Sequence, residues 1–469
     1  MSISGSDVLP PGPPSLPLVG SLLSFARAPL SFLRAAHAAH GDAIYLGKAL
    51  GKHLFVFAHP DAVRHVLQEN HRNYVKGDNF KAIRLVVGDG LVVSEGDHWK
   101  KQRRLVQPVF HRARVAALAE QMGDVVARSH ASWDRLEPGA ELRVAREMMG
   151  ITQRILMRTL FDFDSEDQTA SLCQAWDVVL EHLTARLFAP PIQLPLAIPI
   201  PAHRRFARAM KVLDDTIYGV LRQARERGPG GSGLLPLLLA ARDDETGLGM
   251  TDLEIRDEIM TMFAGGFETS AMVLTWCFHL LAAHPRIYAR VEGEVDAAFE
   301  SSGATWLDRL AQLRHSKSVL EETMRLYPGA WVFTRSNLGP DTVGDYRIPP
   351  GSILFLSPYL THRHPAFWDH PEHFDPERFS PERSKARPRF AYFPFGGGPR
   401  LCVGEAFSTT EMLIVLASTI RRYRLRPVPG CTVEPEGSFT LRPKGDVLMT
   451  LEPRRHPLDG PRGRQNGAS

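Results

Sequence analysis

The chain has 469 residues, of which 43% are hydrophobic and 23% are charged, a balance typical of globular enzymes and unlike that of disordered proteins. Its formal net charge of +4 is small for this length, and no run of lysines and arginines indicates binding to DNA or RNA. The four cysteines are widely spaced without a C-x-x-C pair, which argues against a zinc site.

The first residues argue against export or membrane insertion. They lack the basic start and apolar core of a signal peptide. No later stretch offers the roughly 20 uninterrupted apolar residues of a membrane span. We therefore expect a protein of the reducing cytoplasm that has no transmembrane anchor.

The order of the predicted elements indicates a mostly helical protein with a small β portion. Residues 1–9 form a lead-in, and the Pro/Gly-rich stretch after them is expected to be extended. Amphipathic helical patterns dominate up to about residue 327. Residues 454–469, rich in Pro, Gly and Arg, are expected to be a disordered tail. Short strands are predicted around residues 43–47, 53–58, 346–358 and 447–453.

One long central helix is predicted. Thr251 and Glu254 form a capping box at its start, and the pattern continues to the residues before Pro285, roughly 50 Å at 1.5 Å per residue. Gly265 and Gly266 lie in its middle, where each glycine costs roughly 1 kcal/mol relative to alanine. Close packing against another element explains such a pair, and so does a local opening that admits a ligand. The ionisable Glu268 and the hydroxyl of Thr269 directly after the glycines favour the second explanation.

Cys402 lies in the stretch FPFGGGPRLCVGEAF, residues 393–407. Three roles are open to it: a nucleophile that needs a histidine, a small buried hydrophobic residue, or a thiolate that binds a metal. A following helix N-terminus, backbone N–H groups that the glycines bring near the sulfur, and the cation Arg400 would all stabilise a thiolate. These features favour the metal ligand.

The spacing Phe395-x-x-Gly398-x-Arg400-x-Cys402-x-Gly404 resembles the haem-binding signature of the cytochrome P-450, or haem-thiolate, superfamily. Five specified positions would arise by chance in a chain of this length on the order of 10⁻⁴ of the time. The resemblance is to a soluble, bacterial-type member, and it implies a single large domain over residues 10–453 whose long central helix crosses over the haem. Further family motifs follow in the expected order: Trp99-x-x-x-Arg103, Gly265 to Ser270, Glu322-x-x-Arg325 and Pro376-Glu-Arg-Phe379.

The resemblance implies a site for haem b, iron protoporphyrin IX. Cys402 would be the axial ligand of the iron, shielded by Phe395. The haem propionates would contact Trp99, Arg103, Arg335 and Arg400.

The resemblance also implies a buried ion-pair network behind the haem, formed by Glu322, Arg325 and Arg378. Geometry alone would also allow Glu321 to pair with Arg325, and the sequence PER occurs again at 381–383. The spacing of the family motifs favours Glu322, and the phenylalanine after the first PER favours Arg378.

The implied reaction inserts one oxygen atom of O₂ into a substrate. Thr269 would donate a hydrogen bond to dioxygen, and Glu268 would belong to the proton relay. No G-x-G-x-x-G motif opens a nucleotide-binding unit, so electrons from NAD(P)H would arrive only indirectly, through a ferredoxin or flavodoxin and its reductase. Either a solvated helix face or the docking surface for that partner explains the cations of one helix, Lys100, Lys101, Arg104, Arg112 and Arg114.

The substrate pocket implied by the family is apolar, so the expected substrate is a fatty acid, a terpene or a similar lipid. The proline-rich residues 188–201 resemble a lid over the pocket, although a packed loop is the simpler explanation. The expected lining residues are Phe80, Val87, Met262, Phe263, Gly266, Ala330, Trp331, Val332, Phe333 and Phe439.

Two rival functions use the same haem. One is a peroxide-driven or isomerising enzyme, which the pair Glu268 and Thr269 disfavours. The other is a haem-thiolate gas sensor without enzymatic activity, which would more naturally carry a signalling or DNA-binding module.

Overall fold

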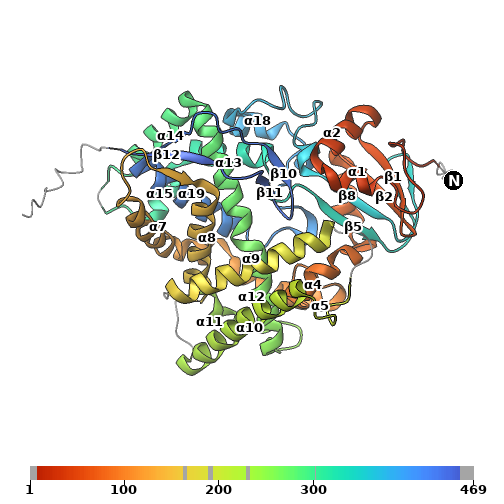
Figure 1. The fold of residues 1–469 in the computed structure, drawn as a ribbon, viewed down its shortest axis with the longest axis horizontal. Helices are drawn as coiled ribbons and strands as arrows, with labels where there is room; N and C mark the ends of the chain where they lie inside the picture. The colour runs from red at the N-terminus through yellow and green to blue at the C-terminus, as the bar shows by residue number, and fades with distance from the viewer. Residues whose placement is uncertain (1–7, 162–165, 189–193, 229–232, 302, 455–469) are drawn as a thin grey trace, which may run out of the picture.

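The protein is described by a computed structural model in which the largest sheet lies at one end of the molecule with α1 and α2, while most of the other helices lie towards the opposite end (Figure 1). The predicted lead-in and tail lie largely outside the described residues. No helix in the described part of the chain combines the length and the apolar character needed to cross a membrane. The described residues are 8–161, 166–188, 194–228, 233–301 and 303–454.

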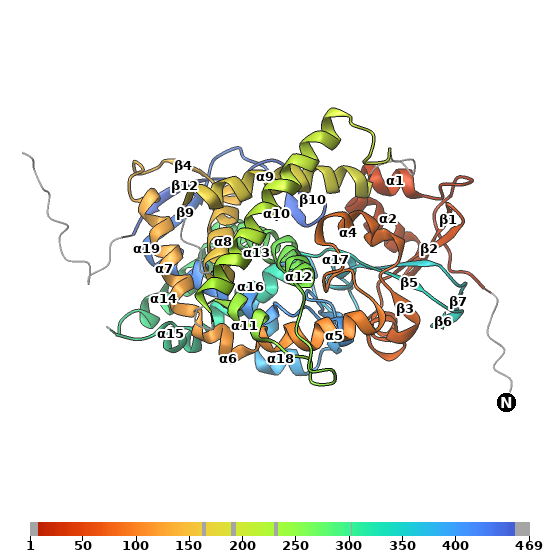
Figure 2. The same cartoon turned by 90° about the horizontal axis from the view of Figure 1, so that it is seen from below.

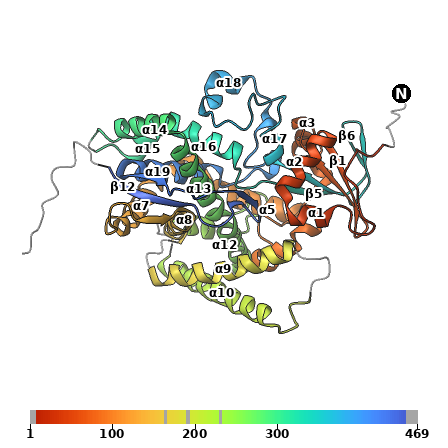
Figure 3. The same cartoon turned by 45° about the horizontal axis from the view of Figure 1, so that its top comes forward.

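Helices make up most of the fold, as the sequence predicts. Two of them, α9 and α10, lie side by side along one face (Figures 1 and 3). The α-helices are α1 (Leu22–Arg27), α2 (Pro29–His40), α3 (Pro60–Arg64), α4 (Lys81–Val87), α5 (Gly96–Val106), α6 (Arg112–Ala117), α7 (Ala119–Trp133), α8 (Val144–Phe161), α9 (Glu166–Phe188), α10 (Pro201–Arg227), α11 (Leu234–Ala240), α12 (Asp252–Gly266), α13 (Glu268–Ala283), α14 (Pro285–Ala298), α15 (Trp306–Gln312), α16 (Arg314–Leu326), α17 (Pro358–Thr361), α18 (Pro381–Lys385) and α19 (Glu405–Arg422).

The β portion consists of small sheets. The largest has the order β1-β2-β8-β5-β3, in which β2 and β8 are parallel and the other neighbours antiparallel. The predicted strands correspond to β1, β2, β7, β8 and β12. The strands are β1 (Ala43–Ala49), β2 (Lys52–Phe57), β3 (Tyr74–Val75), β4 (Glu141–Arg143), β5 (Phe333–Asn337), β6 (Asp341–Val343), β7 (Tyr346–Ile348), β8 (Ile353–Leu356), β9 (Tyr423–Pro427), β10 (Pro435–Gly437), β11 (Leu441–Pro443) and β12 (Leu448–Pro453).

The predicted central helix is interrupted. It consists of α12 and α13, separated at Phe267, where φ is −106° and ψ is −43°. The hydroxyls of Thr269 and Ser270 donate to the carbonyl oxygens of Gly265 and Gly266 at 2.9 and 3.5 Å, which offers these carbonyls side-chain partners. The long helix is therefore interrupted directly after the glycines where the sequence favoured a local opening.

Each explanation for the two glycines holds for one of them. A Cβ on Gly266 would lie 3.0 Å from Leu156 Cδ1 of α8, so this glycine permits close helix packing. A Cβ on Gly265 would meet nothing within 4 Å, and this residue is exposed although it lies in the middle of the molecule. Gly265 therefore borders an open space, which suits the admission of a ligand.

The start of α12 holds the loop that follows α4. Asp257 accepts a hydrogen bond from the Asp89 backbone at 2.8 Å, and Glu258 accepts one from Leu91 at 3.2 Å. Arg256 adds a bond to the Val86 carbonyl at 3.0 Å. Three consecutive side chains of α12 thus bind the end of α4 and the loop after it, which fixes this loop to the central helix.

Glu258 makes the stability of this region depend on pH. Burial raises the pKa of Glu258 from 4.5 to about 8, so the folded protein binds a proton between these values that the unfolded chain has released. The free energy of unfolding should therefore fall as pH rises through this window, by a few kcal/mol at most. Glu258→Gln should flatten the fall, measured by chemical denaturation across the window. The exposed Glu300→Gln is the control, and an unchanged slope in Glu258→Gln would contradict the prediction.

Candidate active site

Cys402 lies in a tight loop directly before α19. Its backbone N–H donates to the Phe395 carbonyl at 3.0 Å, and the loop turns at Gly396 and Gly398, whose φ values are 75° and 64°. A Cβ on Gly398 would lie 1.8 Å from the Leu67 carbonyl oxygen, so only glycine fits there. These glycines serve the turn and its packing.

The sulfur of Cys402 has a different glycine beside it. A Cβ on Gly404 would lie 3.8 Å from Sγ. Burial raises the pKa of the thiol, while the Gly404 backbone N–H and the positive charges of Arg103 and Lys76 oppose the rise. Although the thiol lies deep in the molecule, Cys402 is an exposed residue. It therefore borders an internal space, as Gly265 does.

A cluster of cations lies next to the cysteine loop. Arg335 on β5 is 6% exposed, and Arg400 donates to the Ser94 carbonyl at 2.7 Å and pairs with Glu95. Burial and Arg400 lower the pKa of Arg335 to about 10, and burial followed by Arg335 and Arg400 lowers the pKa of Lys76 well below its usual range. Three cations face one carboxylate here. The excess positive charge suits a ligand that carries two carboxylates.

Trp99 and Arg103 on α5 border the same loop. The guanidinium carbon of Arg400 lies 4.0 Å from the centre of the Trp99 ring. Arg103 donates to the Leu401 carbonyl at 2.7 Å and to Gln107 at 2.8 Å. The structure thus brings Trp99, Arg103, Arg335 and Arg400 together, although they are far apart in the sequence.

Lys76 and Glu95 complete this cluster and were not found from the sequence. The backbone N–H of Lys76 donates to Glu95 at 2.6 Å, and its Nζ lies 4.6 Å from the centre of the Phe80 ring. Neither residue belongs to a recognisable motif. Their position beside the cysteine loop shows that they belong to the cluster, and this position follows from the tertiary fold.

Glu268 and Thr269 bind different partners. Glu268 is 3% exposed, and its Oε1 accepts a hydrogen bond from Thr440 at 2.8 Å, while Oε2 has no hydrogen-bond partner among the described residues. Burial raises the pKa of Glu268, and Thr440 opposes the rise. Thr269 donates to the Gly265 carbonyl at 2.9 Å and is only half-buried. Thr440 lies 172 residues from Glu268, and no sequence signal connects the two.

A second buried carboxyl lies beneath α13. Glu411 on α19 is fully buried, and neither of its oxygens has a hydrogen-bond partner within the described chain. Burial raises the pKa of Glu411 well above its usual value, and the nearby Ser270 opposes the rise. Ser270 in turn hydrogen-bonds Ser408 at 2.9 Å. The signal that could have revealed Glu411 is its position as a lone carboxylate before the apolar run MLIVLA.

The glutamate and arginines of the motif around residue 322 form a buried network. Glu322 binds Arg325 through two hydrogen bonds of 2.6 and 2.8 Å, and the Arg378 Nε lies 3.3 Å from Glu322. Both side chains of the first pair are fully buried. Arg325 also donates to backbone carbonyls of the segment 362–373. Glu321 lies beside Lys317 at 3.9 Å instead.

The predicted pocket residues 330–333 and Phe439 approach the acid–alcohol pair. Gly329 lies against Thr269, because a Cβ on this glycine would be 3.3 Å from the threonine Cβ. Ala330 and Val332 follow in sequence and are half-buried. Phe439, also half-buried, directly precedes Thr440, the partner of Glu268. These apolar residues are therefore next in sequence to the partners of Thr269 and Glu268.

Other predicted pocket residues lie elsewhere. Trp331 is buried in the core of the N-terminal part and donates to the Ser438 carbonyl at 2.8 Å. Phe333 packs against Phe393 at 6.0 Å between ring centres. Val87 and Met262 are buried in the main core.

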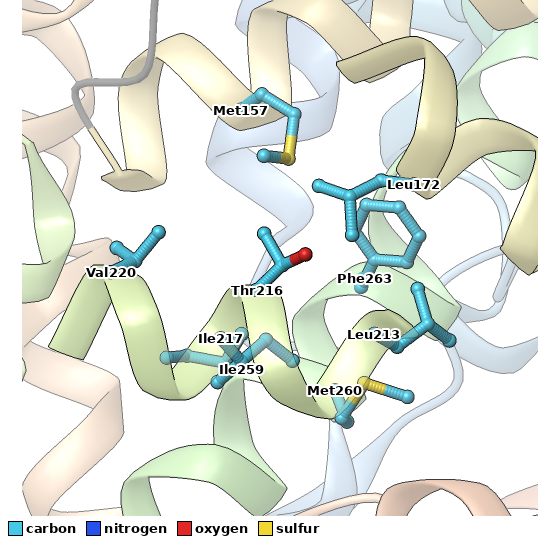
Figure 4. A pocket seen from close by; sticks show the side chains of 9 residues that line it. All are labelled: Met157, Leu172, Leu213, Thr216, Ile217, Val220, Ile259, Met260 and Phe263. Carbon is cyan, nitrogen blue, oxygen red and sulfur yellow. The ribbon is translucent and has the colours of Figure 1, made fainter. Parts of the chain in front are cut away.

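Phe263 lines a small apolar cavity of about 20 Å³ between α8, α9, α10 and α12 (Figure 4). Its ring packs edge-on against Trp176 at 5.1 Å. The cavity is lined by Met157, Leu172, Leu213, Thr216, Ile217, Val220, Ile259, Met260 and Phe263.

The predicted lid is only partly described. Residues 189–193 lie outside the described part of the chain. The following residues up to Ile200 form no helix or strand, and Leu194 and Ile198 are 51% and 40% exposed.

Comparison with known proteins identifies the chain's relatives. A family model described as Cytochrome P450 matches residues 10–450. Cyclooctatin synthase of Streptomyces melanosporofaciens is 37% identical over 445 residues, covering 94% of this chain and 95% of the relative. Pentalenene oxygenase of Streptomyces avermitilis is 33% identical over 431 residues, covering 92% and 94%. The crystal structure of the cytochrome P450DA heme domain superposes with a TM-score of 0.87 at 27% identity, covering 96% of this chain and 98% of that one.

The buried network yields a prediction with a matched control. Glu322→Gln leaves Arg325 and Arg378 without their carboxylate, and should lower the free energy of unfolding by about 3–5 kcal/mol or prevent folding. Glu321→Gln changes the neighbouring glutamate, which is half-buried and outside the network, and should have a small effect. Chemical denaturation of both variants checks the difference. Equal losses would show that the pairing of Glu322 does not matter for stability.

Proposed function

The chain belongs to the cytochrome P450 family and is a monooxygenase, and we propose that its substrate is a terpene or a related lipophilic hydrocarbon. The names of two relatives support this proposal: Pentalenene oxygenase and Cyclooctat-9-en-7-ol 5-monooxygenase, the latter 36% identical over 443 residues. The half-buried apolar residues Ala330, Val332 and Phe439, next in sequence to the partners of Thr269 and Glu268, agree with it. Fatty acids remain the competing substrate class.

The observation that carries the proposed chemistry is the excess of cations beside the Cys402 thiol, in a loop whose following helix, α19, packs against α13, the helix that carries Thr269. Cys402 would ligate the iron of haem b, and Arg335, Arg400 and Lys76 would hold its two propionates, with Trp99 and Arg103 beside them. Because the three cations have one carboxylate, Glu95, between them, they suit a cofactor that carries two further carboxylates. The bound haem would supply the activation of O₂.

Glu268 and Thr269 would hold and move protons. Because Oε1 of Glu268 accepts a hydrogen bond from Thr440, the proton of a neutral carboxyl belongs on Oε2. The raised pKa favours this neutral form, and Oε2 has no other partner among the described residues. The Thr269 hydroxyl donates to Gly265 at rest and can rotate to donate to a ligand in the space that Gly265 borders. Proton delivery from these two groups is the role that we assign to them.

Electrons would come from NAD(P)H through a separate ferredoxin or flavodoxin and its reductase. Of the cations expected at the docking surface, Lys100 pairs with Asp97 at 2.8 Å, Lys101 with Glu254 at 2.7 Å, and Arg104 with Asp243 at 2.8 Å. Two cations remain exposed, with no ion pair within the described residues: Arg112 and Arg114. Their helix, α6, packs against α19, which follows Cys402.

We also infer that residues 10–453 form one domain, located in the cytoplasm. The residues assigned to the site range from Lys76 to Thr440. Because the site draws on residues from most of the chain, dividing residues 10–453 into separate domains would divide the site.

Thr269→Ala tests the proposed chemistry. Without the hydroxyl, product formation supported by NADPH and surrogate redox proteins should fall by about tenfold or more. Thr275→Ala is the matched control, because Thr275 lies on the same helix and also donates to a backbone carbonyl four residues earlier, at 2.7 Å. Substrates are chosen by a Soret-shift screen of terpenes against fatty acids.

Two outcomes would count against the proposal. Turnover with hydrogen peroxide alone that equals turnover with NADPH and is unaffected by Thr269→Ala would favour the peroxide-driven alternative. A Soret shift with fatty acids but not with terpenes would overturn the substrate class.

A further inference from the structure

Two leucines near the N-terminus have a backbone conformation that leucine rarely adopts. The φ values of Leu18 and Leu50 are 69° and 50°, in the left-handed region, where the Cβ crowds the following carbonyl. The backbone N–H of Leu50 donates to the Leu18 carbonyl at 3.0 Å, so the two turns adjoin. Gly51, the next residue, has a φ of 82°, which is the usual choice at such positions.

The side chains of these leucines gain no burial that would offset the strain. Leu18 is 82% exposed and Leu50 is 65% exposed. Two further leucines near Leu18 in the sequence, Leu16 and Leu23, are 58% and 52% exposed. Strained residues persist where their side chains have a use. An exposed leucine in a strained turn has no use in water, because its apolar surface gains free energy only when it leaves water.

The charge around these leucines is positive. Residues 8–60 contain four lysines and arginines and one aspartate, Asp42. His37 and His364 both hydrogen-bond Asp42, at 2.8 and 2.9 Å. Arg27 at the end of α1 and Lys48 in β1 are exposed and form no ion pair within the described residues. Residues 8–60 therefore offer two cations without an ion pair and no unpaired carboxylate within the described part of the chain.

We propose that the surface formed by residues 16–23, 27 and 48–50 docks on an anionic lipid bilayer. The four leucines would enter the boundary between headgroups and acyl chains, while Arg27 and Lys48 would contact the lipid phosphates. The surface lies with α1, β1 and β2 at one end of the molecule, opposite α7 and α15 (Figures 1 and 2). The proposal does not depend on the identity of the substrate.

The shape of the surface favours a bilayer over a second protein. The leucines belong to turns and to the first turn of a short helix, and they expose on the order of a few hundred Å² of apolar area. A standard protein interface buries roughly 800 Å² on each partner. A bilayer can surround small projecting turns because it is deformable.

Vesicle binding tests the proposal. The haem-loaded protein should sediment with vesicles of phosphatidylcholine and phosphatidylglycerol, less with pure phosphatidylcholine, and less at high salt. Leu18→Asn with Leu50→Asn should lower the partition coefficient about tenfold or more. Its Tm should not fall, because asparagine tolerates the left-handed region. The control is Leu307→Asn on α15, where leucine is 50% exposed at the other end of the molecule, and it should bind like the unmodified protein.

Three outcomes would overturn the proposal. The first is no binding of the unmodified protein to either kind of vesicle. The second is equal loss of binding in Leu307→Asn and in the double variant. The third is a dimer in solution that the double variant dissociates, without vesicle binding, which would make a second copy the occupant of the surface.

Discussion

An excess of buried positive charge organises the active site of this protein. Lys76, Arg335 and Arg400 lie beside the cysteine loop, and Glu95 is the one carboxylate among the described residues that pairs with this cluster. Burial without enough counter-charge disfavours the charged forms, as the lowered pKa values of Lys76 and Arg335 record. Such an arrangement costs stability unless an anionic group completes it. The surrounding fold therefore suits the binding of a dianionic cofactor.

The ion-pair network of Glu322 is connected to the cysteine loop of this site. Its arginines bind backbone carbonyls of the segment that leads to the cysteine loop, including that of His362. The ring of His362 accepts a hydrogen bond from the Phe393 backbone at 2.9 Å, at the start of the loop. A continuous set of polar contacts thus links the network to Cys402. Rigid positioning of the thiol is the consequence.

Short motifs allowed much of this to be predicted from the sequence. The spacing around Cys402 and the pair of Glu322 and Arg325 are local, because both depend on residues within one loop or one helical turn. The helical fold class and several strands followed from hydrophobic periodicity. The purpose of the glycine pair was predicted only in part. Gly265 borders an open space, whereas Gly266 permits packing against α8.

The remaining features depend on contacts between distant residues. Nothing near Lys76 in the sequence indicates its burial, and Thr440 reaches Glu268 only through the tertiary fold. The same applies to Lys101, whose charge is neutralised by Glu254, 153 residues away. The interruption at Phe267 directly follows the glycines where the sequence favoured a local opening. Propensity and spacing describe neighbours in the sequence, whereas these contacts are chosen by packing.

The central claim is that Cys402 binds the haem iron as a thiolate within this cation cluster. The most direct measurement is the Soret band of the reduced protein with carbon monoxide, recorded for the unmodified protein and for Cys402→Ala. The account predicts a red-shifted band that disappears in the variant. Persistence of that band in Cys402→Ala would contradict it.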